Sequence, residues 1–422
     1  MRVPIADGGV AVTRRSDDRR QSANDRRKDN AGAEVACRNR ITNSARLNAT
    51  HDCRRNSRHD QRHRKERHKT PTDDADGPGD HPVDVLRRMG EKPRMSLVLR
   101  VRAERLALRA PFRISRGVKT HAEVVVAELA DGEVLGRGEC VPYARYGETL
   151  DGVAARLAAV GDRLRSGMPI EAVLAALPAG AARNALDCAL WDLEARRTGR
   201  SVGQRLGRPP PGPIPTAVTI SLGAPAAMRA AAAAVADAPL LKVKLDAEQP
   251  AACLAAVVEA APDARLIVDP NEGWTLAVLM AMADQISRLN VIMVEQPLPA
   301  DADQDLEGLV YPAPLCADEA VHTSEDLERV AGRYQMVNIK LDKAGGLTEA
   351  LAMADRARAL GLGVMAGCMV CSSISIAPHL WVAAQADACD LDGPWWLAQD
   401  RPGGCRVESG VLYPPQSGFW GG

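Results

Sequence analysis

Two kinds of hydrophobic periodicity follow one another along the chain from about residue 95. The stretches LVLRVRAERLALR, HAEVVVAEL and EVLGRGEC alternate apolar and polar positions, with a turn at Asp131-Gly132 between the last two. Such alternation is typical of half-buried strands, so it predicts a three-stranded meander. Apolar residues then recur at helical spacing over about 151–166 and 181–197, which predicts two helices. The proline-rich block at 207–215 predicts a linker.

A repeating unit occupies the chain after this linker. Short β-branched runs that end in polar residues recur at steps of 25, 26, 23, 22, 27 and 23 residues, measured between Lys244, Asp269, Glu295, Asp318, Lys340, Gly367 and Asp390. Each step is long enough for a strand, a helix and two short loops. With a first run at TAVTIS, the repeat predicts an α/β fold, a (β/α)7β TIM-like barrel whose site lies at the carboxyl ends of its strands.

The first 94 residues differ in composition from the rest of the chain. They hold 23 Lys and Arg against 15 Asp and Glu, they contain no aromatic residue, and they show almost no apolar periodicity. Such a segment cannot bury enough surface to offset its chain entropy, so we expect a disordered basic extension. A nucleic-acid-binding arm is a less favoured alternative, because acids are interspersed and base stacking has no aromatic partner. Another interpretation is translated upstream sequence before a true start at Met95.

The composition of the whole chain excludes several partners. The 422 residues carry 54 Lys and Arg and 54 Asp and Glu, so no net charge draws the protein onto nucleic acid or a lipid surface. No apolar run approaches the roughly 18 residues of a membrane span, and no signal peptide is recognisable. The ten scattered Cys are typical of reduced thiols. We therefore expect a soluble cytoplasmic protein without nucleic-acid or membrane partners, and a homo-oligomer stays open.

Three carboxylates fall at the ends of adjacent predicted strands: Asp269 on the third, Glu295 on the fourth and Asp318 on the fifth. Neighbouring strands of a closed barrel bring their ends together, and like charges at close range raise one another's pKa unless a cation lies between them. Ligands that are all oxygen favour a hard divalent ion, which predicts one bound Mg²⁺. The alternative is that these side chains cap the helices that follow.

Lysines lie on opposite sides of this predicted site. Lys242 and Lys244 are two apart on the second strand and face the barrel mouth, whereas Lys340 ends the sixth strand, diametrically opposite. We expect the charge of Lys242 and the metal to lower a lysine pKa towards neutral pH, as a general base requires. Bases on both faces of a substrate, beside a Lewis acid that stabilises an enolate, suit 1,1-proton transfer next to a carboxylate. The alternative is that the lysines only neutralise the acids.

The eighth strand ends in CDLDGP, in which Asp390 and Asp392 are two apart and point to one side. The eighth strand lies opposite the fourth, so this pair faces the predicted metal across the site. A substrate with its carboxylate at the metal would present its other end here, where two anions suit an ammonium group. The distance favours a dipeptide over a single amino acid. The alternative is that either carboxylate caps a loop.

These residues together resemble the enolase superfamily. The motifs KVK, DPNEGW, VEQP, ADE, NIKLDKAGGLTEA and DLDGP are similar to its muconate-lactonizing subgroup, above all to the L-Ala-D/L-Glu dipeptide epimerases. The resemblance covers essentially all of residues 95–422. It implies an α+β capping domain at 95–212, a catalytic barrel at 213–392 and a C-terminal segment at 393–422 that returns to the capping domain.

The resemblance also implies a role for each site residue. Asp269, Glu295 and Asp318 would bind Mg²⁺, and Lys244 and Lys340 would be the two acid/base catalysts. The residues in contact with the substrate would be Thr219, Lys242, Cys368, Val370, Asp390, Asp392 and Arg116, with Arg113 as the alternative to Arg116. Loops at 112–119 and 143–149 would close over the substrate and exclude water.

The implied reaction converts L-Ala-D-Glu to L-Ala-L-Glu in murein peptide degradation. Cycloisomerase, o-succinylbenzoate synthase and N-succinyl amino acid racemase activities are rivals on the same scaffold, and a nucleic-acid-binding protein with an inactive barrel is a rival of another class. Besides the extension, Pro270 departs from the family pattern, because it follows Asp269 and lacks an N–H. Cys368 and Cys371 form a C-x-x-C pair without a second ligand pair, which disfavours a zinc or redox site.

Overall fold

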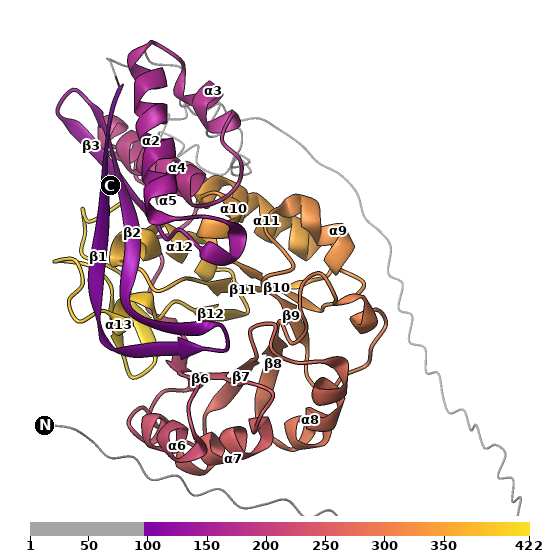
Figure 1. Ribbon diagram of the computed structural model, residues 1–422. Helices are drawn as coiled ribbons and strands as arrows, with labels where there is room; N and C mark the ends of the chain where they lie inside the picture. Colours follow the sequence, from indigo (N-terminus) through magenta and orange to yellow (C-terminus); the bar gives the residue numbers. More distant parts are fainter. Residues whose placement is uncertain (1–96) are drawn as a thin grey trace, which may run out of the picture. The chain divides into compact units, whose positions relative to one another are not determined.

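The computed structural model describes residues 97–422, and the predictions for residues 1–94 lie outside this part of the chain. The described residues contain a three-stranded antiparallel sheet with its helices and an eight-stranded parallel sheet with helices around it (Figure 1). This arrangement confirms the predicted fold, an α/β barrel with a capping domain.

The capping sheet is the predicted meander. β1 (Leu97–Ile114), β2 (Gly117–Asp131) and β3 (Val134–Cys140) pair in antiparallel fashion. β1 and β2 run on beyond the predicted alternation as a long hairpin, and Phe112 pairs with Lys119 near its tip. The prediction of a loop at 112–119 is therefore wrong in form, because strand pairing continues up to a two-residue turn.

Helices pack against this sheet. They are α2 (Leu150–Arg165), α3 (Ile170–Ala175), α4 (Ala181–Thr198) and α5 (Val202–Leu206), and α2 and α4 confirm the two predicted helices. Thr149 begins α2 by accepting a hydrogen bond from Gly152 N. β3 lies directly against α4, and only glycine allows this approach: a Cβ at Gly138 would lie 2.1 Å from Ala185 O.

The parallel sheet closes into a barrel. Its strands follow sequence order and coincide with the predicted runs: β5 (Val218–Ile220), β6 (Leu240–Lys244), β7 (Arg265–Asp269), β8 (Val291–Glu295), β9 (Leu315–Ala317), β10 (Met336–Ile339), β11 (Gly363–Gly367) and β12 (Ala388–Asp390). The first and last strands meet through hydrogen bonds from Ala217 N to Cys389 O (2.8 Å) and from Leu391 N to Thr216 Oγ1 (2.8 Å). One of these bonds uses a side chain, so the closure is not a continuous backbone ladder.

Helices connect most of the strands on the outside of the barrel, as the repeat predicts. The longer ones are α6 (Pro225–Ala233), α7 (Pro250–Ala260), α8 (Leu276–Arg288), α11 (Leu347–Ala359) and α12 (Ser373–Ala383). The shorter elements are η1 (Ala144–Tyr146), η2 (Gln304–Leu306), η3 (Ser324–Asp326), α9 (Leu327–Val330), α10 (Leu341–Ala344) and α13 (Gly393–Trp396).

The connection from β8 to β9 departs from the repeat, since only the 3-10 turn η2 lies where a helix is expected. A hydrogen-bond network lies on this side of the barrel. Gln296 Nε2 donates to Tyr334 Oη (2.9 Å), and Tyr334 Oη donates to Asp303 Oδ2 (2.8 Å). Gln296 Oε1 accepts a hydrogen bond from Asp318 N (2.9 Å). The network thus joins the ends of β8 and β9 to the outer loops.

The predicted linker and the C-terminal segment form a third, small sheet. β4 (Ile214–Pro215) pairs with β14 (Val411–Tyr413), which pairs with β13 (Arg406–Glu408). The chain then reaches the capping sheet, where Trp420 Nε1 donates to Arg137 O (2.9 Å). The C-terminal segment therefore returns to the capping domain, as expected.

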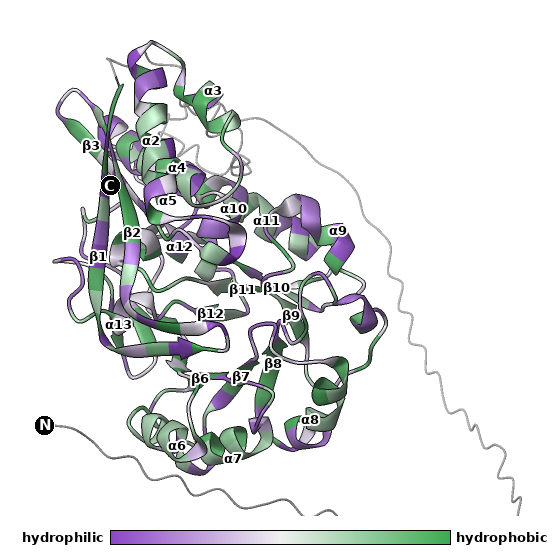
Figure 2. Cartoon of the chain, in the orientation of Figure 1, coloured by the Kyte–Doolittle hydropathy of each residue, from purple (hydrophilic) through white to green (hydrophobic). Residues whose placement is uncertain are grey.

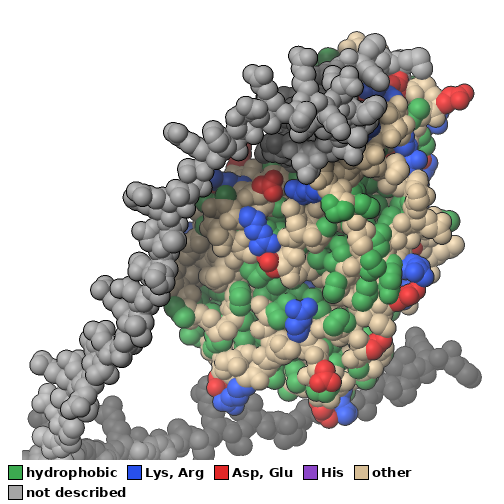
Figure 3. Space-filling model, turned by 180° about the vertical axis from the view of Figure 1, so that it is seen from behind, with side chains coloured by type: hydrophobic (Ala, Val, Ile, Leu, Met, Phe, Trp, Pro, Cys, Tyr) green, Lys and Arg blue, Asp and Glu red, His purple; other side chains and the backbone are tan. Residues whose placement is uncertain are grey.

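Hydrophobic residues concentrate on the inner barrel strands, as β8 shows in Figure 2. From behind, hydrophobic side chains also lie at the surface between scattered charged ones (Figure 3). Within residues 97–422, no helix has both the length and the apolarity needed to cross a membrane. The eight Cys of this part of the chain are all free thiols.

Candidate active site

A cavity of about 650 Å³ lies at the carboxyl ends of the barrel strands, with the β1–β2 hairpin tip and residues 142–150 as its other walls. Ten predicted site residues line it: Thr219, Lys242, Lys244, Asp318, Lys340, Cys368, Val370, Asp390, Asp392 and Arg116. Asp269 and Glu295 are buried and contact Lys242. The fold therefore brings all twelve residues together, whereas Arg113 does not line the cavity.

Lysine–carboxylate pairs occupy opposite sides of the cavity. Lys244 Nζ lies 2.5 Å from Asp269 Oδ2, and Lys340 Nζ lies 2.6 Å from Asp318 Oδ2. Lys244 ends β6, and Lys340 follows β10, four strands further round a barrel of eight. A ligand held between the two amines would present one face to each of them.

The carboxylate beside Lys340 controls its protonation. Burial alone would lower the pKa of Lys340, but the charge of Asp318 outweighs burial and holds this pKa well above its ordinary value. Among the charged side chains, Asp318 acts on Lys340 more strongly than Lys242 does. The lowering of a lysine pKa by Lys242 together with a bound metal stays a prediction. Protonated Lys340 is in the form that donates a proton.

Buried carboxylates surround a positive charge at the base of the site. Lys242 is 2% exposed, and its Nζ lies 3.0 Å from Asp269 Oδ2, 2.7 Å from Glu295 Oε2 and 2.7 Å from Asp390 Oδ2. Burial lowers the pKa of Lys242, but these carboxylates outweigh burial and raise it well above its ordinary value. Glu295 Oε2 is buried and takes part in no hydrogen bond.

This donor set fits a divalent cation. Among residues 97–422 no three acidic, His or Cys side chains form a ready-made metal site, and the Lys242 amine lies between Asp269 and Glu295. The acids nevertheless offer hard oxygen donors from adjacent strands, and Glu295 has a buried oxygen without a hydrogen bond. The position between Asp269 and Glu295 already holds a positive charge. The chemistry of the residues thus suits Mg²⁺.

Two residues outside the predicted site hold these carboxylates in place. Asn338 Nδ2 donates to Glu295 Oε1 (2.8 Å), and Lys343 Nζ donates to Asp318 Oδ1 (2.6 Å). Asn338 precedes Lys340 by two positions, so the alternation that places Lys340 could also have placed Asn338. Lys343 lies on α10, and no periodicity in the sequence indicates that it reaches back to Asp318.

The two aspartates at the end of β12 and just beyond it have different surroundings. Asp392 Oδ2 accepts hydrogen bonds from Thr219 N (2.8 Å) and Trp396 Nε1 (3.1 Å). Asp390 Oδ2 accepts one from Lys242 (2.7 Å), whereas Asp390 Oδ1 is buried without a hydrogen bond. Burial, followed by the charge of Asp390, raises the pKa of Asp392 to about 6. Asp390 Oδ1 is thus available to a cationic group of a ligand.

The pKa of Asp392 predicts a pH dependence. Below about pH 6 Asp392 becomes protonated and neutral, so its attraction for an ammonium group is lost as the pH falls. We expect kcat/KM for a substrate with a free amino group to fall on the acid side of this pKa, with a smaller change in kcat. Initial rates from about pH 5 to about pH 8 would measure the effect. The Asp392→Asn variant should lack this acid limb, and an unchanged limb in that variant would contradict the assignment.

Arg116 at the hairpin tip joins the capping sheet to the barrel loops. Its Nη1 donates to Asn271 O (2.8 Å) and Glu272 Oε2 (3.1 Å), and its Nη2 donates to Tyr143 Oη (3.0 Å) and Glu319 Oε1 (2.6 Å). Burial would lower the pKa of Arg116, but Glu319 and Tyr143 outweigh it and raise the pKa. Arg116 is therefore charged and has four acceptors within the protein.

Glu272, which sequence reasoning also missed, binds a second arginine of the capping domain. Arg145 Nε and Nη2 donate to its two carboxylate oxygens at 2.8 Å each. Asn271 and Glu272 have φ angles of 49° and 66°, a left-handed conformation that is costly for residues with side chains. Asn271 N donates to Asp269 Oδ1 (2.8 Å), so the loop contacts Asp269 even though Pro270 has no N–H.

The segment after β11 supplies the remaining wall. Cys368 N donates to Asp390 O (3.0 Å), which holds this segment beside the two aspartates. Cys371 is buried, and the C-x-x-C pair is not a disulfide. Cys368 and Val370 thus lie at the cavity as neutral groups.

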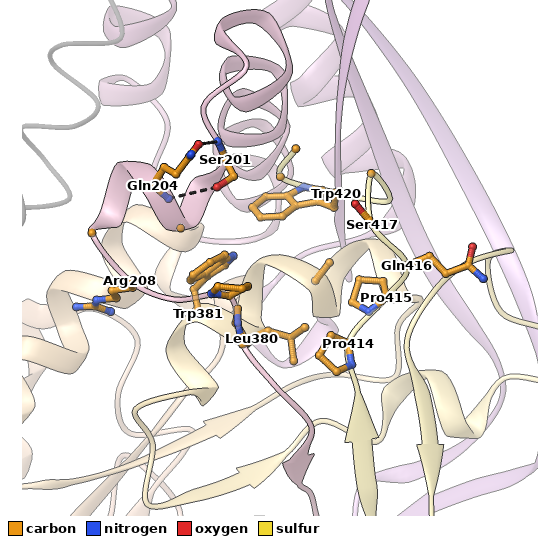
Figure 4. A pocket seen from close by; sticks show the side chains of 18 residues that line it. Ser201, Gln204, Arg208, Leu380, Trp381, Pro414, Pro415, Gln416, Ser417 and Trp420 are labelled. Carbon is orange, nitrogen blue, oxygen red and sulfur yellow. Dashed lines mark hydrogen bonds between the residues drawn. The ribbon is translucent and has the colours of Figure 1, made fainter. Parts of the chain in front are cut away.

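A second cavity, of about 490 Å³, lies between α5, α12 and the C-terminal segment (Figure 4). Trp381, Trp420 and several prolines line it, and none of the predicted site residues does. It contains no Asp or Glu that could serve as a metal ligand or a base. The first cavity is therefore the candidate active site.

Curated relatives resemble most of the chain. It is 47% identical over 317 residues to an L-Ala-D/L-Glu epimerase of Escherichia coli, an alignment that covers 75% of this chain and 99% of that protein. It is 44% identical over 301 residues to an N-acetyl-D-glutamate racemase of Pseudoalteromonas sp., covering 71% of this chain and 95% of that protein.

Solved structures give a consistent comparison. An enolase family member of Agrobacterium tumefaciens, with bound sodium and L-Ala-L-Glu, matches with a TM-score of 0.74 and 45% identity over 77% of this chain and 100% of that one. A dipeptide epimerase of Methylococcus capsulatus, complexed with Mg and L-Arg-D-Lys, matches with a TM-score of 0.68 and 33% identity over 76% and 98%.

Two family models match consecutive parts of the chain. The model of the mandelate racemase/muconate lactonizing enzyme N-terminal domain matches residues 96–207, and the enolase C-terminal domain-like model matches residues 226–419. The chain therefore belongs to the enolase superfamily, as a dipeptide epimerase of its mandelate racemase/muconate lactonizing group.

Proposed function

We propose that this protein epimerises L-Ala-D-Glu and L-Ala-L-Glu by moving the proton on the α-carbon of the glutamyl residue, a reaction of murein peptide degradation in the cytoplasm. The placement of Lys244 and Lys340 on opposite sides of one cavity carries the proposal. A single base would suffice for exchange at one face, whereas inversion of a stereocentre needs a proton donor on the other face.

In each direction of the reaction one lysine acts as the base and the other as the acid. The neutral lysine removes the α-proton from the face that it meets, and the protonated lysine delivers a proton to the opposite face. Their roles exchange for the other epimer, so the reaction is reversible. The hairpin tip and residues 142–150, which line the cavity, would cover the bound substrate and exclude water.

Asp269, Glu295 and Asp318 would hold Mg²⁺. When bound, the ion supplies Lewis-acid stabilisation for the negative charge that develops on the substrate carboxylate. Asn338 and Lys343 donate hydrogen bonds to two of these carboxylates and would orient them, and Lys242, which lines the cavity, would bind the substrate carboxylate. Thr219, Cys368 and Val370 line the space for the dipeptide.

Asp390 and Asp392 would bind the ammonium group of the N-terminal alanine. The orphaned oxygen of Asp390 and the raised pKa of Asp392 are both typical of carboxylates that a cation would stabilise. Arg116 is the sequence-based candidate for the side-chain carboxylate of the substrate, and this assignment stays a prediction.

Racemisation of N-acetyl-D-glutamate is the second candidate, favoured by the 44% identical relative. It uses the same proton transfer, but its substrate has no ammonium group and gives Asp390 no partner. We expect Asp390→Asn to lower kcat/KM for L-Ala-D-Glu about ten- to a hundredfold, because a charge-assisted hydrogen bond is lost. Turnover of N-acetyl-D-glutamate should not fall. Chiral chromatography of both reactions would measure this, and an unaffected dipeptide rate would favour the racemase.

A direct assay tests the proposal as a whole. The purified protein is incubated in D₂O with Mg²⁺ and a small set of L-Ala-X dipeptides, and deuterium at the α-carbon is followed by NMR. We expect exchange and epimerisation of L-Ala-D-Glu. No exchange with any dipeptide would contradict the proposal.

A further inference from the structure

One cysteine of the described chain differs from the others in its exposure. Of the eight free thiols among residues 97–422, seven are buried, and Cys368 alone is partly exposed, at the wall of the active-site cavity. A small reagent that enters the cavity in place of substrate therefore meets this sulfur. Neither the proposed proton transfer nor the proposed metal site uses it.

A second thiol contacts this sulfur. Cys371 lies three residues further on, in the segment between β11 and α12, and it is fully buried. A hydrogen bond with the side chain of Cys368, followed by burial, raises the pKa of Cys371 well above its ordinary value. Cys371 is thus a protonated thiol within hydrogen-bond reach of the exposed sulfur.

The buried member of the pair is held on two sides. A Cβ at Gly393 would lie 3.0 Å from Cys371 Sγ, so this sulfur packs closely against the backbone beyond β12. The next residue, Ser372, donates from its N to Glu139 Oε1 (2.7 Å) on the capping sheet. Cys368 borders the cavity and has room to turn. A bond between the two sulfurs would therefore displace Cys368 rather than Cys371.

We infer that Cys368 and Cys371 form a site of reversible oxidation, at which a peroxide converts the two thiols into a disulfide and withdraws Cys368 from the substrate space. A disulfide needs two thiols and no further ligand. The absence of a second Cys or His pair, which disfavours zinc, therefore does not count against this site.

The reaction consumes one hydrogen peroxide in two steps. The thiolate of Cys368 attacks one peroxide oxygen, the O–O bond breaks, and the proton that Cys368 released converts the departing hydroxide into water, which leaves a sulfenic acid. The sulfur of Cys371 then attacks the sulfenic sulfur. The S–S bond forms, the S–O bond breaks, and the thiol proton of Cys371 leaves with the hydroxyl group as a second water. Both sulfurs are oxidised, and both peroxide oxygens are reduced.

The disulfide would act on substrate binding. Cys368 N donates to Asp390 O (3.0 Å), so displacement of Cys368 reaches the residue proposed to bind the ammonium group. Val370 lies between the two cysteines and also lines the cavity. We expect oxidation to raise KM for L-Ala-D-Glu more than it lowers kcat, with a fall in kcat/KM of about tenfold or more, equivalent to the loss of one hydrogen bond.

The test treats the full chain with hydrogen peroxide and follows two readouts. Mass spectrometry with fragmentation should find a disulfide between Cys368 and Cys371, with the loss of two hydrogen atoms, before the other cysteines of residues 97–422 change. Turnover should fall in parallel, bound substrate should slow both changes, and dithiothreitol should reverse both. Oxidised methionines, Met369 included, need a dedicated reductase, so reversal by a thiol separates the disulfide from methionine damage.

Variants separate the roles of the two sulfurs, each compared with its own untreated turnover. Cys371→Ser should lose turnover in peroxide and not recover, because a sulfenic acid without a second thiol is oxidised further to the sulfinic acid. Cys368→Ser should be insensitive over the same time. Cys253→Ser, which removes a buried thiol on α7, should respond as the wild type does.

Three results would overturn the inference. In the first, Cys368 stays reduced while the wild type loses turnover. In the second, Cys368 is oxidised to the sulfinic acid in the wild type and no disulfide forms. In the third, the disulfide forms and kcat/KM does not change. The mass readout needs no turnover, so a disulfide in a protein that epimerises no dipeptide would refute the proposed function and still support the oxidation site.

Discussion

Removal of either catalytic lysine is expected to abolish epimerisation but to spare exchange at one face of the substrate. In Lys244→Ala, the epimer whose α-proton faces Lys340 should still exchange that proton with D₂O, while the other epimer should not. Lys340→Ala should show the reverse preference. Epimerisation itself should fall by about a hundred- to ten-thousandfold in both variants, because general acid–base catalysis by a positioned group contributes about that much. NMR of each pure epimer would measure both rates.

These lysines also contact acids of the proposed metal site, so a lost rate has two explanations. Mg²⁺ titration by calorimetry separates them, since a variant that keeps the wild-type affinity has lost only its base. If both variants keep Mg²⁺ and neither epimer exchanges in either variant, the two-base assignment is wrong. Exchange of both epimers in Lys244→Ala would equally contradict it.

Replacing Glu295 by Gln should lower the affinity for Mg²⁺ by a factor of similar size. Glu295 is buried, its Oε1 accepts a hydrogen bond from Asn338, and its Oε2 has none. Glu295→Gln keeps the shape but removes the charge and replaces one oxygen donor. We expect Mg²⁺ affinity to fall about a hundredfold or more, since even partners behind a metal ligand are worth ten- to a hundredfold. Calorimetry reports this loss without any assay of activity.

Glu328→Gln is the matched control. Glu328 is paired with Arg356 on the exposed surface, and its replacement should change neither Mg²⁺ affinity nor turnover. Circular dichroism would check that both variants are folded. Wild-type Mg²⁺ affinity in a folded Glu295→Gln protein would remove Glu295 from the ligand set.

The barrel was predictable because each strand is a short β-branched run followed by polar residues. A barrel strand is buried on both faces, which requires a continuous run of apolar residues. Its carboxyl end faces the mouth of the barrel, which requires polar residues there. The same regularity places Asp269, Glu295 and Asp318 on neighbouring strands and Lys340 across from Lys244. Spacing alone therefore brings together most of the site.

What the sequence did not reveal depends on contacts between distant segments. The strands extend to the hairpin tip because backbone pairing between β1 and β2 resumes at Phe112 after a register shift that follows Ala107, and because Leu222 N donates to Arg113 O (3.1 Å). The occupied state of Arg116 depends on Glu272 and Glu319, which belong to two other loops. The raised pKa of Lys340 likewise depends on its distance from Asp318, which spacing does not supply.

The missing helix between β8 and β9 changes what keeps two of the acids rigid. Elsewhere a helix packs against the outside of the strands. Here the side-chain amide of Gln296 stabilises the strand ends instead, through hydrogen bonds to Asp318 N and to Tyr334, which in turn donates to Asp303. Hydrogen bonds are directional, so this network resists lateral displacement of the strand ends more than hydrophobic packing would. A substitution in the loop near Asp303 would thereby weaken Mg²⁺ binding at the proposed site, although it changes none of the three proposed ligands.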